Sequence, residues 1–351
     1  MLRGLQAHGI DVHAVAALQS FASGHVAPED LSVEVIDLRT VARPAASRLR
    51  RFRRPRGSLI GPLSDRVSEL APDFDGVPLE ETETAWCDLG VRRPSSVHLH
   101  FRTLRDRRVP PPWRNEFRFI AECVAAVVAA ARRHKWLVAN SQPVADSLHR
   151  LNRRAEVVVA PLALEAAQYE QASLDGPPVA GLIGSGDWPP TANAVGRLVD
   201  RVWPAVRRLV PDARLRIAGR RTLELEKPGS AREGIEFVGP VDSAADFLSG
   251  LSLLLYPVER GSGMKVKVLE AMACGIPVVT TRAGAEGVAP TDGVLVRAAD
   301  AELVSAAANL LRDPVALVQH GAAGRTAFLE RYTPYPAAAP LAALFRQMAE
   351  S

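Results

Sequence analysis

The stretch that decides the fold is LLLYPVERGSGMKVKVLEAMACGIPVVTTRAGAEGV, residues 253–288. It begins with an apolar run up to a proline, which is typical of a buried parallel strand. A Gly-Ser-Gly turn follows at 261–263, and residues 264–273 carry apolar side chains at helical spacing until Gly275 ends the helix. IPVVTT is a second buried strand. The order strand, turn, helix, strand predicts one βαβ crossover with a right-handed connection.

The glycine-rich turn of this unit suits an anion. We expect the backbone N–H groups of residues 262–265 to point out of the positive N-terminus of the helix, where phosphate binds readily. Lys265 and Lys267 are two of only four lysines in the chain, and Glu270 lies one turn further on, where it can accept hydrogen bonds from sugar hydroxyls. Phosphate donors beside a hydroxyl acceptor indicate a nucleotide-sugar site. The alternative is a structural crossover whose glycines only make the turn.

The longer string GSGMKVKVLEAMACGIPVVTT resembles the donor-site signature of the GT-B glycosyltransferases, family four, in which LEAMA-x-G-x-PVV is highly characteristic. That family usually carries two glutamates separated by seven residues. Glu270 matches the second, and Ser262 stands where the first would be. A subset has a Gly-Ser-Gly loop there and a lysine three residues before the remaining glutamate, which Lys267 matches. The resemblance implies that Glu270 holds the ribose hydroxyls and that Arg260, Lys265 or Lys267 balances the diphosphate.

Length and composition fit this class. A chain of 351 residues, 47% hydrophobic and 23% charged, suffices for two globular domains. It has no run of about 18 uncharged apolar residues, so we expect no transmembrane helix, and the N-terminus lacks the order of a signal peptide. Cys87, Cys123 and Cys274 are far apart and form no CxxC, which is typical of reduced thiols in a cytoplasmic protein.

The N-terminus is unusual for the family. Residues 2–9 resemble the end of an amphipathic helix, and residues 10–18 resemble a strand. In the family a first strand and a glycine-rich turn normally come before that helix, and here there is almost no room for them. We therefore expect an N-terminal domain that lacks its first strand, through a misplaced start codon or a truncation, and we favour the misplaced start.

A basic segment runs from Arg43 to Arg56, RPAASRLRRFRRPR, with seven arginines around Phe52. Dense like charge favours a solvated or disordered loop. A second interpretation is peripheral contact with an anionic membrane at its inner face, because related enzymes often act on lipid-linked acceptors. Nucleic acid is not expected as a partner, because nothing else in the chain supports it.

Two histidines are candidates in the first domain. SSVHLHF, residues 95–101, is a short strand that presents His98 and His100 on one face. It falls near the end of the first sheet, where α/β folds place ligands. Retaining enzymes of the resembled family often place a histidine near the reacting sugar, so either residue is expected to position hydroxyls of the donor or acceptor. The alternative is a packed or solvated histidine.

The second domain opens with VAGLIGSGDWPP. Gly184, Ser185 and Gly186 look like the start of a dinucleotide fingerprint, but Pro189 stands where the third glycine belongs, which weakens an NAD interpretation. By resemblance, residues 184–186 border the interdomain cleft near the donor.

Three further positions follow from the resemblance. Arg220 or Arg221 substitutes for a cation that many relatives place after the next strand, and Val241 contacts the nucleotide base. Glu286 meets sugar hydroxyls or caps a helix, and the sequence leaves both open.

The loss of periodicity in residues 165–178 marks a domain boundary. We expect an acceptor-binding Rossmann-like domain over residues 1–164, that linker, a donor domain over 179–332, and a helix over 333–351 that returns to the first domain.

We thus predict an α/β protein of the GT-B fold, two Rossmann-like domains facing across a cleft. Its activity would be retaining transfer of a sugar from a nucleotide-sugar, UDP favoured and GDP or dTDP possible, to a hydroxyl of a glycan, lipid-linked or small-molecule acceptor. No cofactor and no metal are expected. The alternatives are a degenerate sugar-nucleotide binding module and a sugar-nucleotide epimerase.

The expected catalytic residues are His98, His100, Lys267 and Glu270. The expected donor-binding residues are Gly184, Ser185, Gly186, Arg220, Val241, Arg260, Gly261, Ser262, Gly263, Met264, Lys265, Lys267, Glu270 and Glu286.

Overall fold

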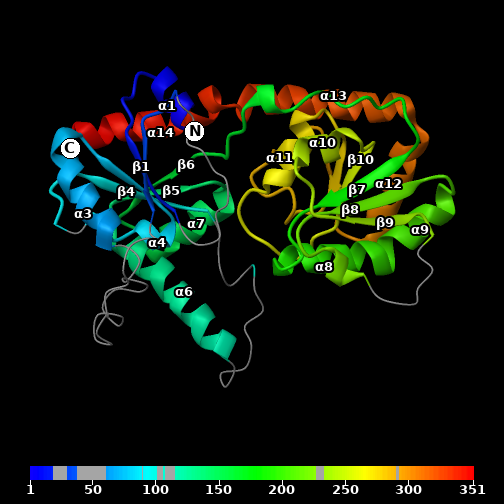
Figure 1. Ribbon diagram of the computed structural model, residues 1–351, viewed down its shortest axis with the longest axis horizontal. Coiled ribbons are helices and arrows are strands. Elements are labelled where there is room, and N and C mark those ends of the chain that lie inside the picture. The colour runs from blue at the N-terminus through cyan, green and yellow to red at the C-terminus, as the bar shows by residue number, and fades with distance from the viewer. Residues whose placement is uncertain are drawn as a thin grey trace. The chain divides into compact units, whose positions relative to one another are not determined.

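The computed structural model describes residues 1–18, 30–37, 61–88, 90–100, 106, 115–226, 233–289 and 292–351. The arginine-rich segment from Arg43 to Arg56 lies outside these residues. Within them, no helix combines the length and the apolar character needed to cross a membrane. The chain divides into two compact units (Figure 1). The first holds the described residues of 1–104, 109–161 and 337–351, and the second holds Asp106 and the described residues of 162–336.

The second unit is built on one six-stranded sheet in which every neighbouring pair is parallel. Its strand order is β12-β11-β10-β7-β8-β9. The strands are β7 (Val179–Ile183), β8 (Arg214–Ala218), β9 (Ile235–Gly239), β10 (Leu253–Tyr256), β11 (Val278–Thr280) and β12 (Val294–Val296). Strands β7, β10 and β11 are buried almost throughout. Near-continuous apolar runs such as LLLY and VVT belong in such a sheet because helices cover both of its faces.

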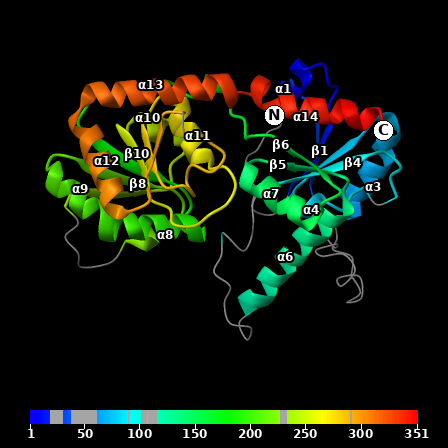
Figure 2. The ribbon, with the colours of Figure 1, turned by 180° about the vertical axis from the view of Figure 1, so that it is seen from behind.

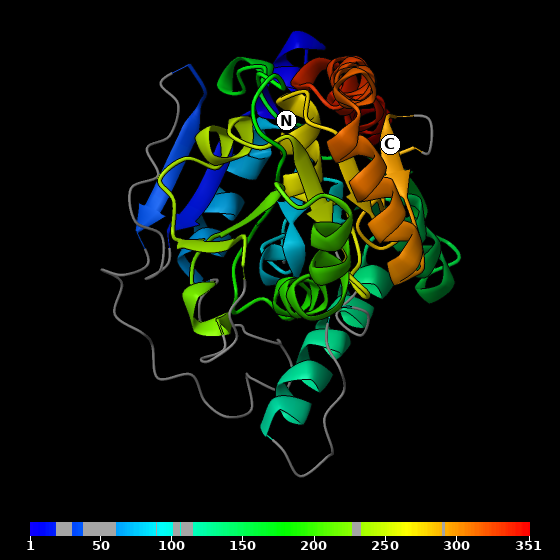
Figure 3. The ribbon, with the colours of Figure 1, turned by 90° about the vertical axis from the view of Figure 1, so that its right-hand side faces the viewer.

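The helices of this unit form two groups, and the members of each group pack against one another. One group contains α8 (Pro189–Arg197), a π-helical turn η3 (Leu198–Val202), α9 (Trp203–Leu209) and α12 (Asp300–Arg312). The other contains α10 (Ala244–Ser249), α11 (Val266–Ala273) and α13 (Pro314–Arg331). In Figure 3, α12 and α13 are drawn in orange, and they contact each other. Trp203, Tyr256 and Phe328 are the largest side chains that this packing buries completely.

The first unit contains two parallel sheets. A two-stranded sheet pairs β1 (Ala14–Leu18) with β2 (Val33–Asp37), and a four-stranded sheet has the order β3-β4-β5-β6. The latter strands are β3 (Val77–Glu80), β4 (Ser95–Leu99), β5 (Trp136–Ala139) and β6 (Glu156–Val159). Before the C-terminal helix, its described helices are α1 (Leu2–Ala7), α3 (Gly61–Leu70), α4 (Glu81–Thr84), α6 (Asn115–Arg133) and α7 (Gln142–Leu151). The Ser141 hydroxyl accepts from the N–H of Val144 at 3.4 Å and caps α7.

The C-terminal helix α14 (Pro334–Ala349) begins at the end of the second unit, and from Ala337 onward it belongs to the first. Ala338, Leu341 and Leu344 pack into a buried cluster with Trp136 and Val138 of β5. Figure 2 shows this helix in red beside the strands of the first unit. The residues that the sequence analysis places in a linker, 165–178, lie in the second unit, where Tyr169 and Ala172 join the core.

A close backbone approach between α11 and α13 gives the first prediction. A Cβ atom on Gly321 would lie 2.1 Å from the carbonyl oxygen of Gly275. Gly321→Ala should therefore lower the free energy of unfolding by about 1–3 kcal/mol, the usual cost of overpacking. Gly196→Ala in α8 is the matched control, because its Cβ would meet no atom within 4 Å and should stabilise by ~0.5–1 kcal/mol. Urea unfolding measures both. A Gly321→Ala protein as stable as wild type would contradict the close packing.

Candidate functional site

The strand order of the second unit reverses beside β7. From β7 the chain proceeds outward through β8 and β9, and it then returns to place β10 on the other side of β7. Ligands of open α/β sheets bind outside the carboxyl ends of the strands at such a reversal. The residues found there are Gly184 and its neighbours after β7, and the turn 261–263 that leads from β10 to α11.

Lys267 on the first turn of α11 occupies this point. Its Nζ donates to Oγ1 of Thr191 at 3.3 Å and lies 4.6 Å from the ring centroid of Tyr256, within cation–π range. A Cβ atom on Gly184 would lie only 2.8 Å from the same Nζ. Burial lowers the pKa of Lys267 to about 8; the charge of Lys265 also lowers it, and Glu270 opposes the shift. The ammonium is thus fixed at the strand reversal, and no carboxylate among the described residues is bonded to it.

The loop after β7 is held tightly against the loop after β8. A Cβ atom on Gly219 would lie 2.1 Å from the carbonyl oxygen of Gly184, and Gly219 has a φ of +127°, which favours glycine. Gly184 N–H donates to Ala218 at 3.0 Å, and Gly186 N–H donates to Arg220 at 2.8 Å. These glycines bring two loops together at the carboxyl edge of the sheet and leave room for the Lys267 side chain.

Glu270 lies one helical turn after Lys267 and is tied to Tyr169. Its Oε1 accepts a hydrogen bond from the Tyr169 hydroxyl at 3.2 Å. Burial raises the pKa of Glu270, while the Tyr169 bond and the charge of Lys267 both oppose the rise. Sequence reasoning missed Tyr169, because it lies in a segment without periodicity about a hundred residues away along the chain.

The glycine-rich turn binds carboxylates of the chain itself. Ser262 N–H donates to Oδ1 of Asp106 at 2.7 Å, and the Ser262 hydroxyl donates to Oδ2 at 2.9 Å. Gly263 N–H donates to Oε1 of Glu286 at 2.8 Å. The helix begins later than the sequence indicates, at Val266 with Lys265 as its N-cap, so the N–H groups of Ser262 and Gly263 belong to the turn before it.

Asp106 is the residue that sequence reasoning could not have found. It is buried beside the turn, 156 positions away in sequence from Ser262. Burial raises the pKa of its carboxyl, although the two bonds from Ser262 and the charge of Lys265 oppose the rise. Lys265 Nζ itself donates to the carbonyl oxygens of Ser262 and Gly263, at 3.0 and 2.5 Å. An anionic ligand on the Ser262 N–H would have to displace the Asp106 carboxylate.

The remaining predicted donor residues lie around this edge with other partners. Arg220 is exposed and pairs with Asp187 at 3.3 Å, and Asp187 also accepts from the Ser185 hydroxyl. Arg260 is exposed, and Val241 is half-buried against the core. Met264 is buried, and its Sδ accepts from the N–H of Leu162 at 3.3 Å. Glu286 is followed by turns rather than a helix, so its carboxylate fixes Gly263 instead of capping a helix.

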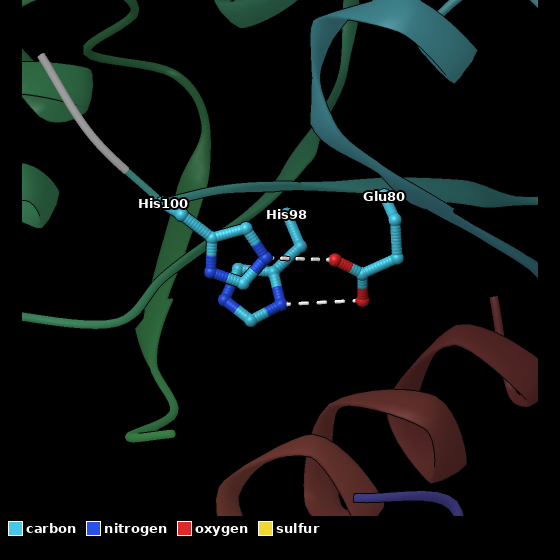
Figure 4. A group of neighbouring side chains, drawn as sticks. All are labelled: Glu80, His98 and His100. Carbon is cyan, nitrogen blue, oxygen red and sulfur yellow. Dashed lines mark hydrogen bonds and ion pairs between the residues drawn. The ribbon is translucent and has the colours of Figure 1, made fainter. Parts of the chain in front are cut away.

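The two histidines of the first unit share one carboxylate (Figure 4). Nδ1 of His98 lies 3.4 Å from Oε1 of Glu80, and Nε2 of His100 lies 2.9 Å from Oε2. The imidazole rings are 4.0 Å apart between centroids. The Glu80 side chain is exposed; partial desolvation of its carboxyl opposes ionisation, but the two imidazoles outweigh it and hold its pKa at about 2. Burial lowers the pKa of His98; at His100 burial also acts to lower the pKa, but the Glu80 bond outweighs it and raises the value. The sequence indicated both histidines but not Glu80.

Comparison with known proteins covers the second unit by sequence. Residues 177–313 match the family model described as Glycosyl transferases group 1. A relative is the GDP-mannose-dependent monoacylated alpha-(1-6)-phosphatidylinositol monomannoside mannosyltransferase of Corynebacterium glutamicum, which is 30% identical over 165 residues. That match covers 41% of this chain and spans 43% of the relative's length.

Solved structures extend the likeness to the whole chain. Sucrose-phosphate synthase from Thermosynechococcus elongatus is similar with a TM-score of 0.71 and 16% identity, covering 100% of this chain and 92% of that one. Anabaena HepE in complex with UDP and glucose is similar with a TM-score of 0.64 and 17% identity, covering 90% and 86%. The protein therefore has the GT-B fold, as the sequence predicted.

The Asp106 contact gives the second prediction. Asp106→Asn keeps an oxygen for the Ser262 N–H but removes the charge that a bound diphosphate would have to displace. We expect pyrophosphate to bind at least about fivefold tighter, because a unit charge at 4 Å contributes about 1 kcal/mol even in water. Isothermal titration calorimetry measures the change. Asp212→Asn, an exposed carboxylate before β8, is the control. Equal affinities in wild type and Asp106→Asn would show that the turn does not bind the anion.

Proposed function

We propose that the protein is a retaining glycosyltransferase that transfers a sugar from a nucleotide-sugar to a hydroxyl acceptor. The observation that carries the proposal is the position of Lys267, an ammonium fixed by Thr191 and Tyr256 at the strand reversal of a GT-B sheet. The match of residues 177–313 to Glycosyl transferases group 1 and the fold of HepE and sucrose-phosphate synthase support it.

In this proposal Lys267 stabilises the departing diphosphate. Cleavage of the glycosidic bond leaves negative charge on the nucleotide, and a cation already in place lowers the energy of that charge without reorganising at the moment of reaction. The partly buried position of Lys267 strengthens the interaction because little water screens it. Arg260 and Lys265 are the further cations of the same turn. No protein carboxylate acts as a covalent nucleophile; the leaving phosphate takes the acceptor's proton.

Glu270 is proposed to hold the ribose hydroxyls. Its carboxylate is oriented by the Tyr169 hydroxyl on one oxygen, which leaves hydrogen-bonding capacity for a ligand. Residues 184–186 and Val241 would adjoin the nucleotide, with Arg220 near its phosphates. His98 and His100 would contact a sugar hydroxyl from the acceptor-binding unit.

The donor is proposed to be a UDP-sugar. HepE is solved with UDP and glucose, whereas the mannosyltransferase relative is named for GDP-mannose, so a GDP-sugar is the alternative. That relative is named for a phosphatidylinositol mannoside acceptor, which supports a lipid-linked acceptor and peripheral contact of the basic segment 43–56 with an anionic inner-membrane surface.

One observation favours a second function, a sugar-nucleotide binding module without turnover. The Asp106 carboxylate engages both donors of Ser262, which stands where the resembled family usually carries its first glutamate. A full-length protein that binds UDP-sugars but releases no UDP from them, with or without added acceptors, would support this second function.

The third prediction tests the Glu270 assignment. Glu270→Gln should weaken UDP binding by about 10- to 150-fold, which corresponds to ~1.5–3 kcal/mol for hydrogen bonds to a charged group. The same substitution should hardly change the affinity for 2′,3′-dideoxy-UDP, which lacks both hydroxyls. Calorimetry on the full chain measures all four affinities, and Glu330→Gln on the exposed face of α13 is the matched control. An equal loss for both nucleotides would remove the ribose role.

The fourth prediction concerns pH. Because the pKa of Lys267 is lowered to about 8, the side chain loses its charge above that pH while a normal lysine keeps it. UDP affinity should therefore fall as pH rises through 8, by up to about tenfold per pH unit. Lys267→Arg should abolish this dependence because arginine stays charged, whereas the control Lys135→Arg should keep it. A wild-type affinity that is constant between pH 7 and 9.5 would exclude Lys267 as the phosphate-binding cation.

A further inference from the structure

The sheet of the first unit gathers three metal-ligating side chains at one place. Glu80 is the last residue of β3, and its Cα pairs in register with that of His98 on β4. His100 lies two residues further along the same strand direction, so its side chain projects from the same face as that of His98. One ligand atom from each residue lies within 4.8 Å of the other two. Strand register therefore brings the exposed carboxylate of Glu80 to the buried His98 and the half-buried His100.

The three groups form a recognised kind of donor set. Two imidazole nitrogens and one carboxylate hold zinc in hydrolytic enzymes and non-haem iron in oxygenases, with coordination positions left open. With zinc–ligand bonds of about 2.0–2.2 Å, tetrahedral ligand atoms lie roughly 3.3 Å apart. The Nδ1 of His98 and the Nε2 of His100 are 3.4 and 2.9 Å from the Glu80 oxygens. Both distances are close to the spacing that one ion requires.

The surroundings favour a cation between these groups. His98 is more than nine-tenths buried, and its Nδ1 faces the Glu80 carboxylate. Within the described part of the chain, no lysine or arginine pairs with the Glu80 carboxylate; its side-chain partners there are the two imidazoles. Figure 4 shows the carboxylate facing both rings, with one nitrogen of each ring turned toward it. A divalent ion would bring positive charge to this carboxylate and bind the nitrogens that now face it.

We propose that Glu80, His98 and His100 bind one divalent transition-metal ion of the zinc type, through Nδ1 of His98 and Nε2 of His100. The ion would join the carboxyl ends of β3 and β4 and keep at least one coordination position for a water or hydroxyl oxygen. The proposal does not rest on the proposed transferase function, although that function assigns the same two histidines to a sugar hydroxyl, because it is based on side chains within the first unit alone. It departs from the expectation, drawn from the sequence, that the protein binds no metal.

Cobalt(II) titration of the full-length protein tests this site directly. After treatment with a chelator and its removal, the protein should bind one equivalent of Co²⁺ and develop visible d–d absorption, which Zn²⁺ should then abolish by displacement. Glu80→Gln and His100→Ala should each weaken Co²⁺ binding by at least about 100-fold, since loss of even outer partners of a metal site costs 10- to 100-fold. His149→Ala, which removes an exposed histidine of α7, should bind as wild type does.

Circular dichroism and melting temperature establish that each variant is folded, and Glu80→Gln preserves the side-chain shape in case a histidine substitution does not fold. Three results would overturn the proposal. The first is that the protein binds neither Co²⁺ nor Zn²⁺ at 100 µM metal. The second is that folded Glu80→Gln binds the metal as tightly as wild type. The third is a near-ultraviolet thiolate charge-transfer band, which would assign the ion to a cysteine. Since the readout is metal binding alone, none of these results bears on nucleotide binding.

Discussion

The placement of the Lys267 ammonium is the constraint on which the proposed site of the second unit depends. A charged group is costly to bury without a partner, and the described residues around this one offer a hydroxyl, an aromatic face and glycine backbone. Gly184 lies beside it with a φ of +153°, which favours glycine, and a Cβ atom there would displace the end of the lysine side chain. The result is a cation with a lowered pKa at the one place in the sheet where the strand order reverses. A site of this kind gains most from an anionic ligand, which restores the lost solvation.

The same region supplies its own anions in the absence of a ligand. The carboxylates of Asp106 and Glu286 accept hydrogen bonds from the N–H groups of Ser262 and Gly263, so these two backbone donors of the turn are paired. This arrangement sets a competition between internal carboxylates and an incoming diphosphate. It also places a carboxylate beside Ser262, the position at which the resembled family usually has a glutamate of its own. A carboxylate from Asp106 that serves in place of this glutamate would fit a transferase. A carboxylate that blocks the turn would fit a binding module without turnover.

The fold was predictable because its signal is local. The apolar runs of β10 and β11 and the helical spacing of α11 lie within 36 consecutive residues, and the structure has the predicted strand–helix–strand unit there. The glycines, Lys267 and Glu270 come from that same stretch. Partners contributed by distant segments could not be predicted. Tyr169, Asp106 and Glu80 reach their sites only through tertiary packing, and no motif or periodicity marks any of them in the sequence.

The histidines show the same limit on a smaller scale. Two-residue alternation places His98 and His100 on one face, and the structure has them side by side. The pairing of β3 with β4 that brings Glu80 to them depends on register, which alternation alone does not specify. The sequence therefore indicated two separate candidate histidines, whereas the structure contains a cluster of three ligating groups.

The most direct test of the account is a crystal structure of the full-length chain with bound UDP. We predict the diphosphate within hydrogen-bond distance of Nζ of Lys267 and the ribose hydroxyls on the Glu270 carboxylate, with Asp106 released from the N–H of Ser262 if the phosphate takes its place. Ordered UDP at any other edge of the sheet, or at Lys267 with its ribose turned away from Glu270, would contradict the account.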